Sequence, residues 1–327
     1  MLTKRENLME TIKGGKPDRF VKQYEAFEII MEAPMAGPMP MPGETVKNAW
    51  GITFSWPEGQ LGSFPVHDDE HRVLKDITTW KDVVKAPPIE TSDEAWAAAV
   101  AHAEAIDRKD KFVTAFIAPG LFEMTHHLMG VEDALMSFYE EPEDMLELIE
   151  YLADYELRYA EEYLKHVKVD AILHHDDWGS QISTFISPAM FEEFLLPSYK
   201  KIYKFWKDNG VEIIMHHSDS YAATLIPYMI DMGMDIWQGV MNTNEIPTII
   251  EKYGKDITFM GGLHSGLVDF PTWTPEVIAK QVAETCTANG YKYFIPCQTS
   301  GLPIESFPGV NATIDLEIDR MSQEIFN

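Results

Sequence analysis

A single (β/α)8 barrel is the fold that this sequence predicts, and three observations lead to it. Short apolar runs rich in β-branched residues alternate with longer helical patterns, which is typical of a parallel sheet. Seven or eight such units fit within the 327 residues. The sequence also contains no Gly-rich dinucleotide turn, so a barrel is favoured over an open sheet.

Each predicted barrel strand is a short apolar run. In chain order the runs are residues 19–27, 112–118, 171–175, 212–217, 235–240, 257–261 and 292–296. A weaker candidate covers residues 61–66. Residues just beyond the carboxyl end of each strand would face the active site of such a barrel.

Helical spacing of apolar residues between these runs predicts the outer helices. The clearest cover residues 143–166, 189–207, 222–232 and 275–288. Ser187 and Thr274 each place a capping hydroxyl before a proline at the first helical position. Gly210 and Gly290 are expected to end the preceding helices.

Residues 32–63 fit the alternation poorly and are read as an irregular N-terminal insertion within one domain. The segment interleaves prolines with methionines, namely Pro34, Met35, Pro38, Met39, Pro40, Met41, Pro42 and, later, Pro57. It is either a surface excursion or a lid. Because Met and Trp side chains adapt to flat apolar ligands, a lid would let Trp50 and Trp56 line an aromatic pocket.

The charge balance excludes several classes of partner. Lys and Arg number 26 against 53 Asp and Glu, a formal net charge of −27. Nucleic-acid binding needs a cationic footprint, and an anionic membrane or polyanionic substrate is disfavoured for the same reason. No apolar run is long enough to span a membrane, and the first residues turn polar at once. With only two cysteines, a cytoplasmic enzyme is expected.

The richest chemical stretch is residues 172–179, Ile-Leu-His-His-Asp-Asp-Trp-Gly, at a predicted strand end. Neighbours along a strand point to opposite faces, so its four polar side chains cannot all meet one ligand. Asp176 or Asp177 could orient a histidine, act as a general acid or bind a metal. Alternatively, one aspartate caps the next element and one histidine belongs to the core.

A second stretch, residues 214–220, reads Ile-Met-His-His-Ser-Asp-Ser. His217 and Asp219 are two residues apart, so an extended backbone would place both on one side. Imidazole and carboxylate suit zinc or a similar divalent ion. His264 and Cys297 are the obvious further ligands, although a lone cysteine is more often an inert buried residue. The alternative is a hydrogen-bonded polar strand end.

Several segments resemble the uroporphyrinogen decarboxylase superfamily. They include Asp-Asp-Trp-Gly-Ser-Gln at 176–181, the Ser-Pro helix start and following residues at 186–197, and Pro-Gly-Leu-Phe-Glu at 119–123. Residues 128–130, 141–143, 213–220 and 294–298 fit as well. The resemblance covers most of the chain from about residue 112 onward. It implies a barrel and either of two activities, porphyrinogen decarboxylation or methyl exchange with corrinoid proteins.

The methyltransferase branch is the better match. The decarboxylases use an arginine-rich segment at the first strand, where this chain has only Lys22 and Gln23, and Glu25 would repel a substrate with many carboxylates. The methyltransferases typically bind zinc through His-x-Cys and a later cysteine. His217 and Asp219 correspond to the first pair, with an aspartate in place of the thiol. A register shifted by one residue would select His216 and Ser218.

The later cysteine of that branch aligns near Cys297 or Gln298. The aspartate that replaces one thiolate ligand in this chain fits better with those branch members that take methyl groups from aromatic methyl ethers. The segments Trp50-Gly51 and residues 56–60 are similar to these demethylase-type relatives.

We therefore expect a methyltransferase that moves a methyl group from a small, methoxylated aromatic donor to the cobalt of a corrinoid on a partner protein. The expected metal, zinc or similar, is assigned to His217, Asp219, His264 and Cys297. Catalytic roles are assigned to Asp177, Asp176, His175, Tyr24 and Glu25. Substrate contacts are assigned to Trp178, Gln238, His174, His216 and Gln298.

The hypothesis includes a partner protein and a possible homodimer, and two rival functions stay open. The corrinoid protein would dock at the carboxyl-terminal face of the barrel, and related enzymes suggest a homodimer. One rival is a metal-free decarboxylase or other lyase that acts on a smaller acid. The other is a non-enzymatic corrinoid- or tetrapyrrole-binding protein.

Overall fold

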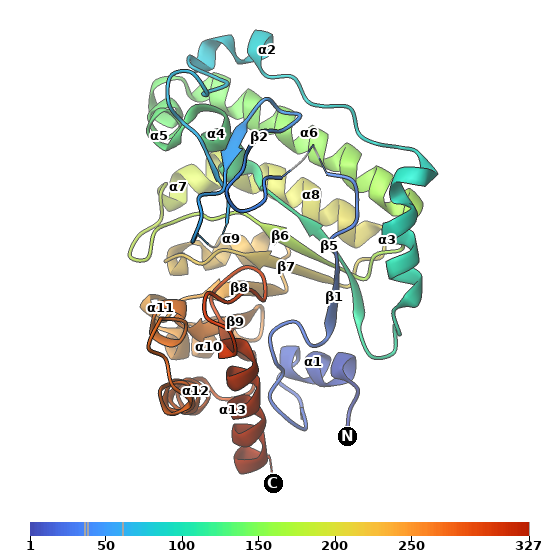
Figure 1. Cartoon of the computed structure of the whole chain (residues 1–327), viewed down its shortest axis with the longest axis vertical. Coiled ribbons are helices and arrows are strands. Elements are labelled where there is room, and N and C mark those ends of the chain that lie inside the picture. The colour runs from blue at the N-terminus through green and yellow to red at the C-terminus, as the bar shows by residue number, and fades with distance from the viewer. Residues whose placement is uncertain (36, 38, 61, 327) are drawn as a thin grey trace.

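A seven-stranded parallel sheet forms the centre of the molecule (Figure 1). The computed structural model describes residues 1–35, 37, 39–60 and 62–326. The strands lie in the order β1 (Phe27–Ile30), β5 (Phe112–Ile117), β6 (Ala171–His175), β7 (Ile213–His217), β8 (Ile236–Val240), β9 (Thr258–Leu263) and β10 (Phe294–Gln298). All neighbouring pairs are parallel. This curled sheet is consistent with a barrel of the (β/α)8 type.

Helices connect the strands and cover the outside of the sheet (Figure 1). Those before β6 are α1 (Lys4–Ile12), α2 (Trp80–Val83), α3 (Asp93–Ala105), α4 (Leu121–Met129), α5 (Val131–Glu140) and α6 (Pro142–His166). Those after it are α7 (Pro188–Met190), α8 (Leu196–Asp208), α9 (Ile226–Asp231), α10 (Ile246–Tyr253), α11 (Ser265–Val268), α12 (Pro275–Asn289) and α13 (Val310–Ile325). Ser187 and Thr274 cap α7 and α12 as predicted.

Six of the seven predicted strands are confirmed, and the first is wrong. Residues 20–22 have no regular secondary structure, residues 23–26 form a turn, and β1 begins only at Phe27. The reason is that this segment folds back on itself, with the N–H of Phe27 donating to the carbonyl of Tyr24 at 2.8 Å. The Tyr24 hydroxyl also donates to the carbonyl of Gly301 at 2.7 Å, beyond β10. This turn lies between the two edge strands, β1 and β10.

The insertion at residues 32–63 is not irregular throughout. β2 (Thr45–Lys47), β3 (Thr53–Ser55) and β4 (Phe64–Pro65) form a small antiparallel sheet, so the weak strand at 61–66 is present but belongs to this sheet. Pro38 and Leu61 lie outside the described residues. Trp50 is buried against Tyr155 of α6, with ring centroids 4.8 Å apart, so it packs in the core instead of facing a pocket.

Two apolar layers flank the sheet. Leu173 and Met215 belong to the cluster inside the curl, whereas Ile172 and Ile214 belong to the cluster between the sheet and the outer helices. This alternation fixes which polar residues at the strand ends face inward. Among the described helices, none is long and apolar enough to cross a membrane.

Candidate metal centre

The ends of β6 and β7 place four histidines in two pairs. The parallel register sets His174 beside His216 and His175 beside His217. Because side chains alternate along a strand, the first pair points outward with Ile172 and Ile214, and the second points into the mouth of the curl. The His175 and His217 ring centroids are 4.5 Å apart.

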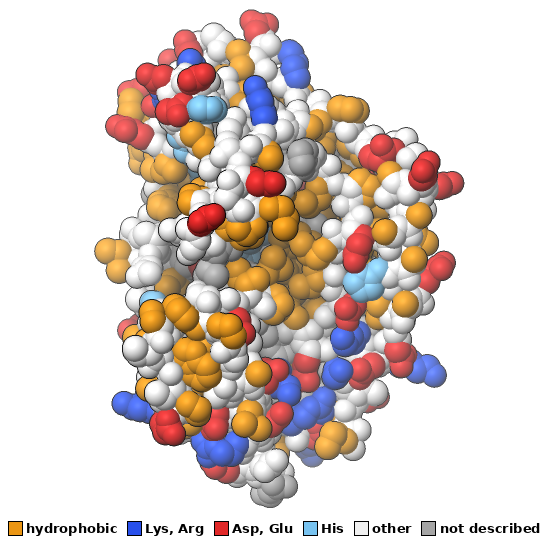
Figure 2. Space-filling model, viewed as in Figure 1, with side chains coloured by type: hydrophobic (Ala, Val, Ile, Leu, Met, Phe, Trp, Pro, Cys, Tyr) orange, Lys and Arg blue, Asp and Glu red, His pale blue; other side chains and the backbone are white. Residues whose placement is uncertain are grey.

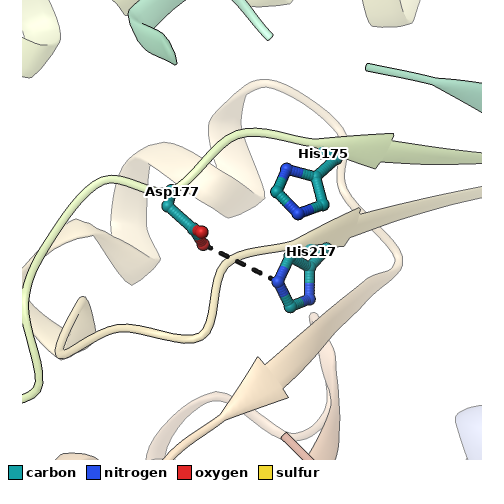
Figure 3. Close-up of side chains that lie close together, drawn as sticks. All are labelled: His175, Asp177 and His217. Carbon is teal, nitrogen blue, oxygen red and sulfur yellow. Dashed lines mark ion pairs between the residues drawn. The ribbon is translucent and has the colours of Figure 1, made fainter. Parts of the chain in front are cut away.

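His175, Asp177 and His217 form a group that could hold a metal ion (Figure 3). One ligand atom from each residue lies within 4.8 Å of the other two. The His217 Nε2 atom is 3.7 Å from Oδ1 of Asp177. Two imidazoles and one carboxylate are a donor set that suits zinc and related divalent ions.

Two further side chains orient the histidine rings. His175 donates from Nδ1 to the Glu123 carboxylate on α4 at 3.0 Å. His217 donates from Nδ1 to the amide oxygen of Gln238 on β8, whose own Nε2 donates to the Ser300 carbonyl at 3.0 Å. Because Nδ1 of each ring is engaged in this way, Nε2 is the ring nitrogen left to bind a metal, and that of His217 faces Asp177. Metal-binding histidines commonly have a carboxylate or carbonyl at the second ring nitrogen, so these residues fit a divalent ion.

Asp176 does not reach this group, because it points the other way and is completely buried. Its carboxylate accepts hydrogen bonds from the N–H groups of Phe122 at 3.0 Å and Glu123 at 2.7 Å. It also accepts from the Trp178 indole at 2.9 Å and from the Tyr199 hydroxyl. Asp176 thus secures the start of α4, which carries Glu123, so its contacts in this structure are those of a positioning residue.

Three predicted substrate contacts are buried behind the strands, because they belong to the outward-facing set. His174 donates to Glu156 of α6 at 2.8 Å, and His216 is 2.6 Å from the Tyr203 hydroxyl of α8. Trp178 stacks on His216 with centroids 4.0 Å apart. All three predicted residues, His174, His216 and Trp178, are fully buried. Gln238 is buried too, where it holds His217.

Charge and burial shift the protonation of the inward-facing groups. Burial alone would lower the pKa of His175, but the carboxylates of Glu123, Asp177 and Asp176 outweigh it and raise that pKa to about 10. Burial and the charge of His175 lower the pKa of His217 to about 4. Burial, followed by repulsion from Asp177, raises the pKa of Asp219 to about 7. The site thus concentrates carboxylates that a cation would neutralise.

Asp219, His264 and Gln298 line a cavity of about 450 Å³ formed by the loops after β6 to β10. The cavity begins beside the metal group, since the Asp219 N–H donates to Oδ1 of Asp177 at 3.0 Å. The His264 Nδ1 atom accepts from the N–H of Gly266 at 3.0 Å. Gln298 donates to Asn311 at 2.7 Å.

The remaining predicted residues are not members of the metal group. Cys297 is buried in the apolar cluster inside the curl, and burial raises the pKa of its thiol. The Tyr24 hydroxyl is engaged by Gly301, and burial raises its pKa. Glu25 is half-buried and accepts from the Lys22 N–H at 3.2 Å. Burial raises the pKa of Glu25 as well.

Of the four predicted ligands, only His217 belongs to the metal group that the structure brings together. His175 and Asp177, which were predicted to be catalytic, complete the group. Sequence reasoning also missed Glu123, although it lies at the end of the Pro-Gly-Leu-Phe-Glu motif. That motif follows β5, the neighbour of β6, which is the signal that could have identified it.

Three comparisons place the chain among known proteins. The family model for uroporphyrinogen decarboxylase (URO-D) matches residues 44–306. No curated protein sequence matches significantly. A methyltransferase from Methanosarcina mazei has a similar structure, with a TM-score of 0.65 and 14% identity over 98% of this chain and 99% of that one. At this identity the likeness shows a shared fold.

Two other solved structures match weakly. A 2,3-dimethylmalate lyase of the PEP mutase/isocitrate lyase superfamily has a TM-score of 0.34 and 11% identity over 99% of this chain and 87% of that one. An N-acetyl-D-glucosamine-6-phosphate deacetylase from Mycobacterium smegmatis has a TM-score of 0.28 and 14% identity over 64% and 53%. The family match covers well over half of the sequence, and the strand order and barrel-like curl agree with it. The chain belongs to the uroporphyrinogen decarboxylase family.

Proposed function

We propose that this protein is a metal-dependent methyltransferase that takes a methyl group from a small methyl ether, such as a methoxylated aromatic compound. The acceptor is the cobalt of a reduced corrinoid carried by a partner protein. The observation that carries this proposal is the group of His175, Asp177 and His217 at the strand ends, beside a cavity of ligand size. The structural likeness to a methyltransferase supports it.

The chemistry must overcome a poor leaving group. The methyl carbon leaves the ether oxygen for cobalt, which supplies the electron pair of the new bond. The electrons of the broken C–O bond stay on oxygen, which then takes up a proton. A divalent ion at this site supplies Lewis acidity toward that oxygen.

The residues of this chain bind and orient the reactants. His175, Asp177 and His217 would hold the ion, while Glu123 and Gln238 keep both imidazole rings turned toward it. The cavity next to Asp177 would hold the remainder of the donor. Such positioning lowers the barrier by fixing the reacting atoms in place.

Charge favours this reaction over decarboxylation of a porphyrinogen. Among the described residues that line the cavity there is neither Lys nor Arg, whereas Asp219 and Asp269 both border it. A substrate with many carboxylates would need several cations there. An ether has no such requirement.

The test combines metal analysis with methyl transfer. We expect the zinc-loaded protein to form methyl-cobalt from 2-methoxyphenol and a reduced corrinoid protein, which is followed by absorbance. His217→Ala should lose the metal and slow methyl transfer about 100-fold or more. His102→Gln, a change at a partly exposed histidine on α3, is the matched control and should leave both unchanged. Full activity after removal of the metal would contradict the proposal, as would absence of methyl-cobalt across a broad panel of ethers.

A further inference from the structure

The cavity beside the metal group has a distinctive lining. Its volume of about 450 Å³ lies within the range of small-molecule sites. Ser180, Ser265, Thr299 and Ser300 supply hydroxyl groups or polar backbone along its wall. Met241 and Ile304 are the larger apolar contributors among its described residues. The ligand that fits such a wall is small and carries polar groups of its own.

One carboxylate in the wall is free to bind a ligand. Asp269 is already engaged, because it accepts from the N–H groups of Ser306 at 2.6 Å and Phe307 at 2.9 Å. The backbone N–H of Asp219 donates to Asp177 of the metal group. Among the described residues, none forms a hydrogen bond or ion pair with the Asp219 carboxylate. The Asp219 side chain therefore offers the cavity a carboxyl group that no described residue engages.

His264 supplies the second free group. Its Nδ1 atom accepts from the Gly266 N–H, which fixes the ring at the start of α11. The Nε2 atom has no hydrogen-bond partner in the described part of the chain. Because Nδ1 is an acceptor there, the neutral ring carries its proton on Nε2 and can donate to a ligand.

The electrostatics of the site oppose anions. Glu123 and Asp177 lie at the metal group, and Asp219 and Asp269 border the cavity. Lys and Arg side chains lie toward the upper and lower edges of the face in Figure 2, away from the hollow in its middle. No described cation lines the cavity to offset these acidic groups. A ligand carboxylate near Asp219 would thus be repelled.

We propose that this cavity binds the non-methyl part of the donor and selects a hydroxyl-bearing methyl ether that has no carboxylate. The donor hydroxyl gives its hydrogen bond to the Asp219 carboxylate, and His264 contacts a second oxygen. This assignment rests on the proposed function, since it names the donor class of the same site. Asp219 is thereby the residue that determines specificity.

Three ligands that differ by one group each test the assignment. They are 2-methoxyphenol, 1,2-dimethoxybenzene, which lacks the hydroxyl, and 4-hydroxy-3-methoxybenzoate, which adds a carboxylate. Their affinities are measured by calorimetry on the zinc-loaded full-length protein without corrinoid. We expect 2-methoxyphenol to bind at least about tenfold more tightly than either of the others, since a site built for a hydroxyl rejects an analogue without it.

The variant Asp219→Asn removes the charge and keeps the size. It should weaken 2-methoxyphenol and strengthen the benzoate, so that the gap between them shrinks at least severalfold, with zinc content unchanged. Asp208→Asn, at an exposed residue of α8, is the control and should preserve the order. Equal or tighter binding of the benzoate overturns the inference. So does an unchanged order in Asp219→Asn, loss of zinc from that variant, or binding of none of the three.

These outcomes are separable from failure of the proposed function. If the affinity order holds but no methyl-cobalt forms, the cavity assignment stands and the reaction is wrong. If methyl transfer occurs and prefers the benzoate, the reaction stands and the selectivity inference is wrong.

Discussion

The backbone N–H of Glu123 donates a 2.7 Å hydrogen bond to the carboxylate of Asp176. The Glu123 side chain in turn accepts from Nδ1 of His175 at 3.0 Å. Asp176 directly follows His175, the last residue of β6, and their side chains point to opposite faces, so the start of α4 connects them around the strand end. A buried residue that touches no ligand thus controls the orientation of a metal ligand.

Replacing Asp176 should weaken metal binding without direct loss of a ligand. Asp176→Asn puts an amide donor among the N–H groups of Phe122, Glu123 and Trp178, which displaces Glu123. We expect zinc affinity to fall about 10- to 100-fold, the usual cost of disturbing such outer contacts. Competition with a chelator measures the affinity. Tyr199→Phe removes one of the four hydrogen bonds to the carboxylate, together with the bond that the hydroxyl accepts from the Leu121 N–H at 3.1 Å. Because the N–H groups of Phe122 and Glu123 stay bound to Asp176, it should have a smaller effect. Equal affinities for wild type and Asp176→Asn would contradict the role.

Metal affinity should depend on pH through His175. The carboxylates around His175 raise its pKa to about 10, so the metal-free site is protonated near neutral pH. Ligation requires the unprotonated ring. Zinc affinity should therefore rise close to tenfold per pH unit between pH 7 and 9, with release of about one proton. Calorimetry in buffers of different ionisation enthalpy counts that proton. Glu123→Gln should flatten the dependence, and a pH-independent affinity in wild type would refute it.

A side chain at position 301 should weaken zinc binding. A Cβ atom there would lie 3.0 Å from Nε2 of His217 and 3.1 Å from two ring carbons. Gly301→Ala should displace the ring and reduce zinc affinity about tenfold, with the unfolding midpoint nearly unchanged. Gly62→Ala is the matched control, because a Cβ at Gly62 meets no atom within 4 Å. If both variants bind zinc like the wild type, the contact does not constrain His217.

Buried histidines should make the fold sensitive to acid. Burial lowers the pKa of His126 on α4 to about 4, against an ordinary value of about 6.5. Between these values the folded protein holds fewer protons than the unfolded chain. The contribution of His126 is therefore complete above about pH 6.5 and is lost as the pH falls toward 4. Urea unfolding at pH 7 and pH 5 should show about 1 to 2 kcal/mol from this residue. His126→Gln should reduce that difference, whereas an identical difference would assign it to other groups.

The fold could be predicted from the sequence more completely than the site. Six barrel strands were predictable because alternating apolar runs and capped helices are local signals. Residues 19–27 were wrongly predicted as a strand because their apolar content is typical of one. In the structure, Tyr24 forms a hydrogen bond to a loop 277 residues further along the chain, which no local pattern indicates. His217, predicted as a metal ligand, lies in the group that could hold an ion. The sequence could not distinguish Cys297 from a residue of the apolar interior, which is where it lies.

The sequence by itself determined the alternating α/β fold, the family and the clustering of imidazole and carboxylate groups at two strand ends. Only the tertiary structure decided which of those groups converge. The register of β6 against β7 turned His175 and His217 inward and His174 and His216 outward. The register of β7 against β8 set Gln238 beside His217, and the packing of α4 brought Glu123 to His175. A pattern in sequence records local periodicity, whereas contacts between distant segments depend on how strands align and how helices pack.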